Sequence, residues 1–265
     1  YINDCRENGI RVLPPSINSS LYDFSIEDKS LRFGFGAIKG LGEKAIENII
    51  ETREKCGSFK TLKQFLENVE LSVVNKGVLE ALIKSGSFDA IHKNRAQLFE
   101  SIDLIIDLSR KYQQDNESGQ GDLFSMDSSH DSSRISSDLP SVTEWKDNIK
   151  LNFEKEVLGL YLSGHPLARF EKEISSFPSY TLSEICDENC SGDVSVVGII
   201  SNVTVKRSQK NGKQYATGLF EDLNGSIEIL IFSKVLDKFN DLINCGEPVM
   251  VTGKIEMEGD KPKKI

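Results

Sequence analysis

Two groups of residues have types and spacing suited to binding phosphate, and the first is a Gly-Leu-Gly turn at residues 40–42 before an amphipathic pattern. Glycines permit a tight turn, and free backbone N–H groups at a helix start attract a phosphate. The turn therefore predicts a helix-hairpin-helix element that grips a nucleic-acid backbone without reading its sequence. Alternatively, it only joins two helices, and nearby Glu43 and Glu47 weaken the case for binding. The candidate backbone-contact residues are Lys39, Gly40, Gly42 and Lys44.

The second group is a run of cations around Asn211-Gly212, which is a strong signal for a two-residue hairpin turn. Cations contact phosphates and aromatic rings stack on bases, so this hairpin predicts binding of a single strand. Alternatively, a charged hairpin tip only keeps a sheet edge in water. The candidate residues are Lys206, Arg207, Lys210 and Lys213, with Tyr215 and Phe220 on the strand beyond.

No catalytic or metal-binding constellation accompanies these groups. Asp103 and Asp107 lie one helical turn apart, but we interpret them as solvent-facing charges on an amphipathic helix. His165 precedes a proline and more simply marks a rigid turn than a general base. Of five cysteines only Cys186 and Cys190 are close in sequence, which favours reduced thiols and no metal. Walker, zincin, nucleophile-elbow and Rossmann motifs are absent from the sequence.

Composition bounds the architecture and the partners. A chain of 265 residues is long enough for two compact units with connectors. Its net charge of −9 excludes a protein that coats nucleic acid over its whole surface, so any contact must be local. No apolar run approaches the roughly 20 residues that span a bilayer, which predicts a cytoplasmic protein without membrane contact. The chain begins at Tyr1 and stops within a β-rich pattern, so we expect a fragment of a longer polypeptide.

Helices should position the Gly-Leu-Gly turn. Ala45, Ile46, Ile49 and Ile50 share one face of the helix that follows it, and three more helical patterns occupy 61–69, 75–86 and 94–112. Short polar breaks between them predict a compact helical unit. A polar stretch over 113–142 then predicts a flexible linker, because it has too few apolar residues to repay the entropy of ordering. Helical periodicity returns in a connector over 143–192.

Strands should position the basic hairpin. From Asp193 the apolar period becomes two, with three strand patterns, a short helix and further strand. This order is typical of a small Greek-key barrel of the OB type. The fifth strand would begin at about the residue where the sequence ends, so we expect an incomplete barrel. The predicted fold is α+β and multidomain: an α-helical helix-hairpin-helix unit, a disordered linker, a helical connector and an incomplete OB-fold β-barrel.

Four blocks of the sequence, in order, resemble the bacterial DNA polymerase III alpha subunit family, the replicative C-family DNA polymerases. The blocks are 1–20, 31–53, 78–91 and 154–167. The resemblance implies that 1–30 ends the fingers domain, that 31–112 is a tandem helix-hairpin-helix region holding duplex DNA, and that 193–265 is an OB fold contacting single-stranded template. It also implies a palm domain before this chain, where Mg²⁺ and carboxylates transfer nucleotides. The fragment itself would hold no catalytic residue and no cofactor.

The resemblance further implies a sliding-clamp peptide, broadly Gln-x-Asp/Ser-Leu/Met-Phe, inside the linker. The sequence fits at Gln120, Asp122, Leu123 and Phe124, whereas Gly121 departs from peptides with Leu at that place. Two apolar anchors would enter a pocket on the clamp, and a polar tether would carry them. Alternatively, the Leu-Phe pair is accidental. The implied partners are double- and single-stranded DNA, the clamp (beta subunit) and other replicase subunits.

Two other classes compete with the polymerase interpretation. The OB fold of an aminoacyl-tRNA synthetase would resemble the barrel, but it would leave the Gly-Leu-Gly turn and the 120–124 peptide unexplained. A DNA-repair scaffold such as a ligase would be expected to show a nucleotidylated lysine motif or zinc cysteines, and neither occurs. Among polymerase relatives, an error-prone paralogue is a poorer fit because it is less expected to keep the clamp peptide.

Overall fold

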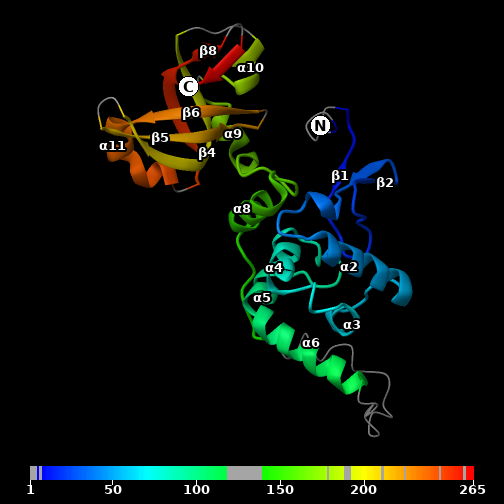
Figure 1. Cartoon of the computed structure of the whole chain (residues 1–265). Coiled ribbons are helices and arrows are strands. Elements are labelled where there is room, and N and C mark those ends of the chain that lie inside the picture. Colours follow the sequence, from blue (N-terminus) through cyan, green and yellow to red (C-terminus); the bar gives the residue numbers. More distant parts are fainter. Residues whose placement is uncertain are drawn as a thin grey trace. The chain divides into compact units, whose positions relative to one another are not determined.

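The chain forms two compact units, Tyr1–Gly164 and His165–Ile265 (Figure 1). The computed structural model describes residues 5, 8–117, 139–177, 179–187, 192–209, 212–223, 225–244, 246–258 and 261–265. Within these residues, no helix is both long enough and apolar enough to cross a membrane. The first unit is mainly helical and the second is built on a curled sheet, so the predicted α+β class is confirmed.

A three-stranded sheet opens the first unit. Its strands are β1 (Val12–Leu13), β2 (Ser25–Glu27) and β3 (Ser30–Arg32), in the order β1-β3-β2. Asp28 and Lys29 connect β2 to β3 with positive φ angles of 47° and 63°, as a tight hairpin turn requires. In this sheet β1 pairs in parallel with β3, so the first 30 residues are joined by strand pairing to the segment that follows them.

Helices make up the rest of the first unit. They are η1 (Phe35–Ala37), α2 (Glu43–Cys56), α3 (Leu62–Asn68), α4 (Lys76–Lys84), α5 (Arg95–Glu100), α6 (Ile102–Glu117) and α8 (Asp147–Leu158). Side chains of Thr61, Asn75 and Asn94 cap α3, α4 and α5 by accepting a backbone N–H. The helical patterns expected at 61–69 and 75–86 are confirmed, and the pattern at 94–112 forms two helices separated by Ser101.

One apolar core joins the helices of the first unit. Phe65 lies at its centre and makes edge-to-face contacts with Phe59 and Phe88, with ring centroids 5.1 and 5.0 Å apart. Ile17, from the segment before β2, is fully buried in this core. Val157 and Leu158 of α8 belong to the same cluster. Residues before position 118 and residues after position 138 therefore share one hydrophobic core in the first unit.

The second unit begins with short helices η3 (Ala168–Phe170), α9 (Glu171–Ile174) and α10 (Leu182–Asp187). Its sheet has the strand order β7-β4-β5-β6-β9-β8 (Figure 1). The strands are β4 (Asp193–Arg207), β5 (Gln214–Glu221), β6 (Ser226–Phe232), β7 (Val249–Lys254), β8 (Glu256–Glu258) and β9 (Lys261–Lys264), with α11 (Ser233–Asn244) between β6 and β7. The outermost strands β7 and β8 are consecutive in the chain, so the sheet curls back toward its own edge.

The order and directions of these strands are those of the predicted OB-type barrel. The strands β4, β5 and β6 form an antiparallel meander, and β9 pairs in parallel with β6. Val194, Val196 and Ile200 point into the core, as their period of two predicts. The last strand, β9, is only four residues long.

Candidate nucleic-acid interface

The predicted Gly-Leu-Gly turn leads into α2 and leaves the start of that helix bare. Gly40 has a φ of 91°, which side-chain-bearing residues rarely adopt. Gly42 is the N-cap residue in an extended conformation, and it has no side chain to bond the first N–H groups. A Cβ atom at Gly42 would meet nothing within 4 Å. Packing within the described residues therefore does not require glycine at position 42.

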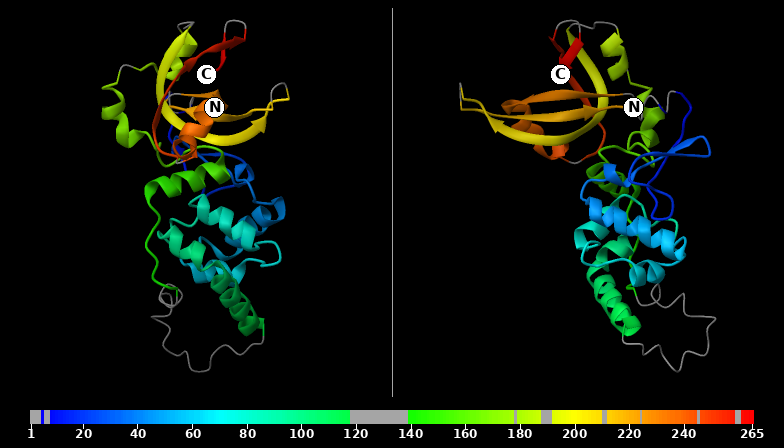
Figure 2. Two further views of the ribbon diagram at one scale, coloured as in Figure 1. Left: turned by 90° about the vertical axis from the view of Figure 1, so that its left-hand side faces the viewer. Right: turned by 45° about the vertical axis from the view of Figure 1, so that its right-hand side comes forward.

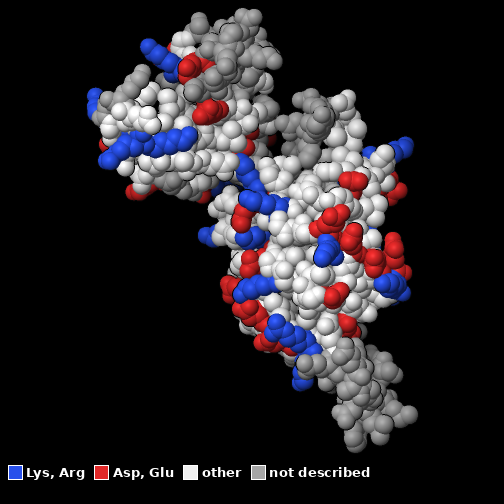
Figure 3. Space-filling view, in the orientation of Figure 1, with Lys and Arg blue, Asp and Glu red and all other residues white. Residues whose placement is uncertain are grey.

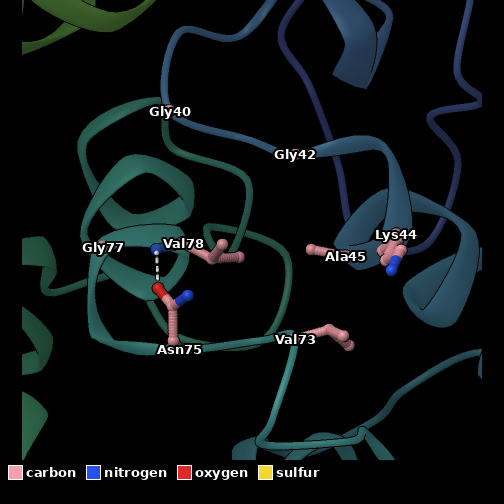
Figure 4. Close-up of a pocket in the computed structure, with 8 residues that line it drawn as sticks. All are labelled: Gly40, Gly42, Lys44, Ala45, Val73, Asn75, Gly77 and Val78. Carbon is pink, nitrogen blue, oxygen red and sulfur yellow. Dashed lines mark hydrogen bonds between the residues drawn. The ribbon is translucent and has the colours of Figure 1, made fainter.

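The start of α2 faces the start of α4 across a small pocket (Figure 4). The pocket has a volume of about 300 Å³. Its lining comes from the Gly-Leu-Gly turn, the first turn of α2, and the beginning of α4 with the loop before it: Gly40, Gly42, Lys44, Ala45, Val73, Asn75, Gly77 and Val78. Two helix N-termini border the same space, and each carries the positive end of a helix dipole. An anion placed there would gain from both ends.

The two helix starts are not equally available. The Asn75 side chain accepts a hydrogen bond from the Val78 backbone N–H at 3.2 Å and so caps α4. Lys76 Nζ donates to both carboxylate oxygens of Asp103 at 2.7 and 2.9 Å, and this contact raises the pKa of Lys76. The start of α4 thus already has partners within the protein. The capacity to bind an added anion lies mainly at α2.

Charges of both signs surround the bare helix start. Lys39 and Lys44 are exposed, and so are Glu43 and Glu47. Because two acids offset two cations, the net field at this place is weak. Any preference for phosphate here would have to come from the backbone N–H groups of α2, with the lysines as secondary contacts. On the face drawn in Figure 3, acidic and basic side chains are likewise mixed over the first unit.

Both sides of the pocket are held by rigid helices. The backbone N–H of Lys39 donates to the Val157 carbonyl of α8 at 2.8 Å, which fixes the turn from behind. Asn48 of α2 accepts from the Glu70 backbone N–H at 2.9 Å and so holds the loop that leads to α4. The pocket is thereby preformed, and binding would not require its backbone to be ordered first.

A buried ion pair holds α8 in place behind the turn. Arg95 Nη1 donates to Glu154 Oε1 at 3.0 Å, and Glu154 also accepts from the backbone N–H and hydroxyl of Ser163. Arg95 further bonds Asp89 through two nitrogens. Burial tends to lower the pKa of Arg95, but the contacts with these two carboxylates prevail and raise it. Breaking this pair would leave an uncompensated buried charge, so α8 is a firm support.

In the second unit, the predicted basic hairpin is formed by the last residues of β4 and the first residues of β5. The pairing shifts register between Ser201 and Thr204, and Asn202 has a φ of 53°, so β4 carries a bulge. Beyond the bulge, residues 204–207 are all exposed. They pair with residues 214–217, of which Ala216 is buried. This end of the two strands, here called the ribbon, reaches out from the curled sheet (Figure 2).

Three of the four predicted cations lie together on the ribbon. Lys206 and Arg207 pair with Tyr215 and Gln214 in the ladder, and Lys213 lies beside them, all three cations being exposed. The fourth, Lys210, is outside the described residues. Lys and Arg side chains are visible on the face of the second unit that Figure 3 shows. The structure therefore brings Lys206, Arg207 and Lys213 to one place, as the hairpin signal predicts.

The two predicted aromatic residues do not share a face. Phe220 is fully buried in the core of the barrel, so the prediction that it stacks on a base is wrong. Tyr215 and Phe220 are five positions apart, and side chains an odd number of positions apart point to opposite faces of a strand. Tyr215 is partly exposed and remains available.

Phe232 is the aromatic residue that sequence reasoning missed. Its side chain is 65% exposed, and it pairs directly with Tyr215 across β5 and β6. A row of Lys206, Tyr215 and Phe232 thus crosses three neighbouring strands on one face. The period-two pattern contained the signal, because Ile227, Ile229 and Ile231 point inward and the next residue must point outward.

The clamp-peptide residues Gln120, Asp122, Leu123 and Phe124 lie outside the described residues. The described chain on either side of them is held to the helical unit. Gln113 Nε2 donates to the Val69 carbonyl at 2.8 Å, and Asn94 Nδ2 donates to the Val142 carbonyl at 2.8 Å. Glu144 accepts from the backbone N–H groups of Arg95 and Ala96 at the start of α5, and these bonds lower its pKa despite the opposing effect of burial.

No metal centre is formed by the residues that the structure describes: no group of three or more His, Cys, Asp or Glu side chains could hold an ion. Asp107 bonds Arg110 at 3.2 Å, and its neighbour on the same helix face, Asp103, bonds Lys76. His165 Nδ1 accepts from the Leu167 backbone N–H at 3.2 Å within its own turn. These side chains thus have structural partners within the described part of the chain.

Comparison with known families agrees with this geometry. Residues 9–98 match the family described as helix-hairpin-helix motif, and residues 194–264 match the family described as OB-fold nucleic acid binding domain. The bare α2 start lies within the first match and the ribbon within the second. Each candidate contact therefore belongs to a module of a recognised nucleic-acid-binding type.

Whole-chain relatives decide the family. The chain is 34% identical to DNA polymerase III subunit alpha of Borreliella burgdorferi over 98% of its own length and 23% of that protein. It is 35% identical to the protein of the same name from Neisseria meningitidis and 31% to that of Escherichia coli, each over 97% of this chain and 22% of the relative. By sequence, this chain belongs to the DNA polymerase III alpha subunit family. It spans less than a quarter of the length of these curated relatives.

Membership of the DNA polymerase III alpha family decides between the interpretations left open by the sequence. The synthetase and repair-scaffold alternatives account for the barrel or the turn alone. The family matches over nearly the whole chain, including the segments between the two modules. The Gly-Leu-Gly turn and the ribbon therefore lie in one continuous family sequence.

Proposed function

We propose that this chain is the DNA-handling part of a DNA polymerase III alpha subunit. The observation that carries the proposal is the bare start of α2, which borders a preformed pocket together with a second helix N-terminus. A phosphate there would accept hydrogen bonds from the first N–H groups of α2, with Lys39 and Lys44 adding cations. Such contacts hold a duplex by its backbone and read no base. A replicative enzyme needs this property because it must pass over every sequence.

The ribbon supplies the second contact, with single-stranded template. Lys206, Arg207 and Lys213 would neutralise phosphates, and Lys210 extends the same run of sequence. Tyr215 and Phe232 offer ring faces for bases at neighbouring ladder positions. Stacking of this kind accepts any base because every base has a π face. The two units would thus handle the two forms of DNA that meet at a primer terminus.

The clamp contact is the third part of the proposal. Leu123 and Phe124 would enter an apolar pocket on the sliding clamp while Gln120 bonds a polar subsite and Asp122 completes the motif. The segments on either side are tied to the helical unit through Gln113 and Asn94. Attachment at both ends would limit the positions that the peptide can reach, and this would raise its effective concentration near the clamp.

The activity of the whole protein is proposed from its relatives. It would be a cytoplasmic DNA-directed DNA polymerase that works with other replicase subunits. The nucleotidyl-transfer step and its Mg²⁺ ions would belong to a palm domain, and we assign no catalytic residue to this chain. The role of residues 1–265 would be to hold the product, the template and the clamp.

A binding titration with the full chain tests the single-strand contact. We expect a thymidine oligonucleotide to bind more weakly when Lys206, Arg207, Lys210 and Lys213 are all changed to Gln. The dependence of log affinity on log salt should become shallower by up to about three, since each phosphate neutralised on a single strand contributes roughly 0.7. The control matched for charge changes four exposed lysines of the first unit to Gln, namely Lys55, Lys60, Lys93 and Lys111. Equal losses in both variants would remove the ribbon from the proposal.

A second titration tests the clamp contact separately. The full chain is titrated with the cognate sliding clamp, before and after Leu123→Ala with Phe124→Ala. The double variant should lose most of the binding, because anchors of this kind dominate short-peptide affinity. Retention of full affinity would reject the clamp contact and leave both DNA contacts standing.

A further inference from the structure

Helix α11 has more apolar surface than its packing in the barrel uses. Leu236 and Ile243 are buried in the barrel core, with 4% and 5% exposure. Val235, Phe239 and Leu242 are 48%, 39% and 54% exposed at intervals of four and three residues, and the helix is kinked at Phe239, whose φ of −123° and ψ of 23° are not helical. A surface helix that packs on one neighbour needs a single apolar stripe. The second stripe of α11 therefore indicates an interaction surface.

The outward stripe continues onto the sheet. Phe232, at the end of β6, immediately precedes α11 and is the most exposed of the four side chains at 65%. We call the four residues Phe232, Val235, Phe239 and Leu242 the α11 stripe. Two of them are aromatic and two aliphatic. The α11 stripe thus extends from the end of β6 over both sides of the kink in α11, which is long enough for a short segment of a partner.

The basic side chains of α11 lie closer to the α11 stripe than the acidic side chains do. Lys234 and Lys238 are exposed one helical turn apart, and Lys238 Nζ lies 4.9 Å from the centre of the Phe239 ring. Asp237 and Asp241 are also one turn apart. Before the kink at Phe239, a rotation of about 100° per residue places Lys234 and Lys238 between Asp237 and Val235. The solvent-side border of the stripe is therefore positive.

We propose that the α11 stripe docks an acidic amphipathic peptide from a partner protein, with apolar anchors flanked by Asp or Glu. Its anchors would cover Val235, Phe239 and Leu242, and its carboxylates would pair with Lys234 and Lys238. Charge complementarity selects this occupant. A nucleic-acid strand would find two aliphatic side chains that offer no ring to stack on, and it would meet Asp237 and Asp241 beyond the lysines. A second copy of the chain would bring the lysines of both copies to one interface.

This docking site goes beyond the DNA contacts of the proposed function, although Phe232 borders both. Binding of the peptide should depend on Val235, Leu242, Lys234 and Lys238. It should not depend on the ribbon cations. Failure of one proposal therefore leaves the other standing.

The test is a fluorescence titration of the full chain with a labelled synthetic peptide that carries Leu and Phe at helical spacing among Asp and Glu. One control peptide has Lys in place of the acids, and another has Ser in place of the anchors. We expect saturable binding of the acidic peptide and at least roughly tenfold weaker binding of each control. Val235→Ser with Leu242→Ser should cause a similar loss, and so should Lys234→Glu with Lys238→Glu.

Matched variants separate the site from its surroundings. Asp237→Asn with Asp241→Asn should keep or strengthen peptide binding, and the four-residue ribbon variant should leave it unchanged. Circular dichroism melting of each variant checks that the barrel still folds. The proposal is overturned if the acidic peptide does not bind, or if the Lys peptide binds equally well. It is also overturned if the Val235/Leu242 variant loses only oligonucleotide binding or only self-association measured by sedimentation.

Discussion

The starts of α2 and α4 border the same pocket but differ in what they leave open. At α2 the N-cap is Gly42, which offers no side-chain acceptor, and at α4 it is Asn75, which bonds the Val78 N–H. Glycine at an N-cap gives up only a few tenths of a kcal/mol relative to Asn. The difference teaches that α2 loses little stability by keeping its first N–H groups free, and on our proposal these groups receive a phosphate.

The lysines beside the two helix starts differ in the same way. Lys76 at α4 is held by Asp103, whereas Lys39 and Lys44 have no ion-pair partner among the described residues. A lysine that must leave a carboxylate before it meets a phosphate contributes less to binding. We therefore assign duplex contact to α2 and a structural role to α4, and the predictions below are ways to break that assignment.

The largest effect is expected from reversing the two free lysines. Lys39→Glu with Lys44→Glu should weaken duplex binding by at least roughly tenfold near 0.1 M salt, because both cations become repulsive to phosphate. Fluorescence anisotropy with a labelled duplex measures the loss. Reversal of exposed Lys60 and Lys111 is the matched control and should have a much smaller effect. Equal losses in the two variants would mean that only net charge matters.

Removal of the α4 cap should affect stability and spare binding. Asn75→Ala leaves the Val78 N–H without its acceptor, so the free energy of unfolding should fall by about 1 kcal/mol. Trp145 is the single tryptophan and packs in the first unit, so its fluorescence in urea reports on that unit. Duplex affinity should stay within about twofold of the wild type. A loss of binding as large as that of the lysine reversal would make α4 a second contact.

A gain of affinity is expected from the acids beside α2. Glu43→Gln with Glu47→Gln should strengthen duplex binding by about two- to fivefold, because the lysines then act without opposing charges. The control is Glu51→Gln with Glu54→Gln, which lie farther along the same helix. If both pairs raise affinity equally, the effect is one of overall charge and does not locate the site.

The smallest expected effect is on the pH dependence of stability, and it comes from Lys155 on α8, the helix behind the Gly-Leu-Gly turn. Burial lowers the pKa of Lys155 on α8 from its ordinary 10.5 to about 8. Between these values the unfolded chain binds more protons than the folded one, so this group makes stability rise with pH across that window. Lys155→Met should flatten that rise in urea unfolding followed by Trp145. Identical pH profiles for both proteins would show that Lys155 ionises normally in the fold.

Local signals in the sequence predicted the turn before α2 and the pairing of β4 with β5, each of which depends on one short segment. The Gly-Leu-Gly turn and the Asn-Gly hairpin were recognisable because turn geometry restricts residue type. The pocket was not predictable, because it depends on how α2 and α4 pack, and Asn75 was taken only as the first residue of a helical pattern. Such tertiary placement leaves no local trace in the sequence.

The aromatic residues show a failure that sequence reasoning could have avoided. Phe220 was chosen because it lies on the strand beyond the basic hairpin, although the period of that strand places it in the core. Phe232 was missed because its partner lies on another strand, and only the register of β5 with β6 brings it beside Tyr215. Spacing along one strand can be read directly, whereas pairing between strands requires the fold.

One substitution tests the central claim, that the α2 start is kept bare to receive a phosphate. Gly42→Asp would cap the helix and place a negative charge in the pocket, with Gly42→Ser as the uncharged control. We predict that urea unfolding shows equal stability or a gain of up to about 1 kcal/mol, while duplex affinity falls by roughly tenfold or more. A stable Gly42→Asp protein that binds duplex DNA as tightly as the wild type would contradict the account.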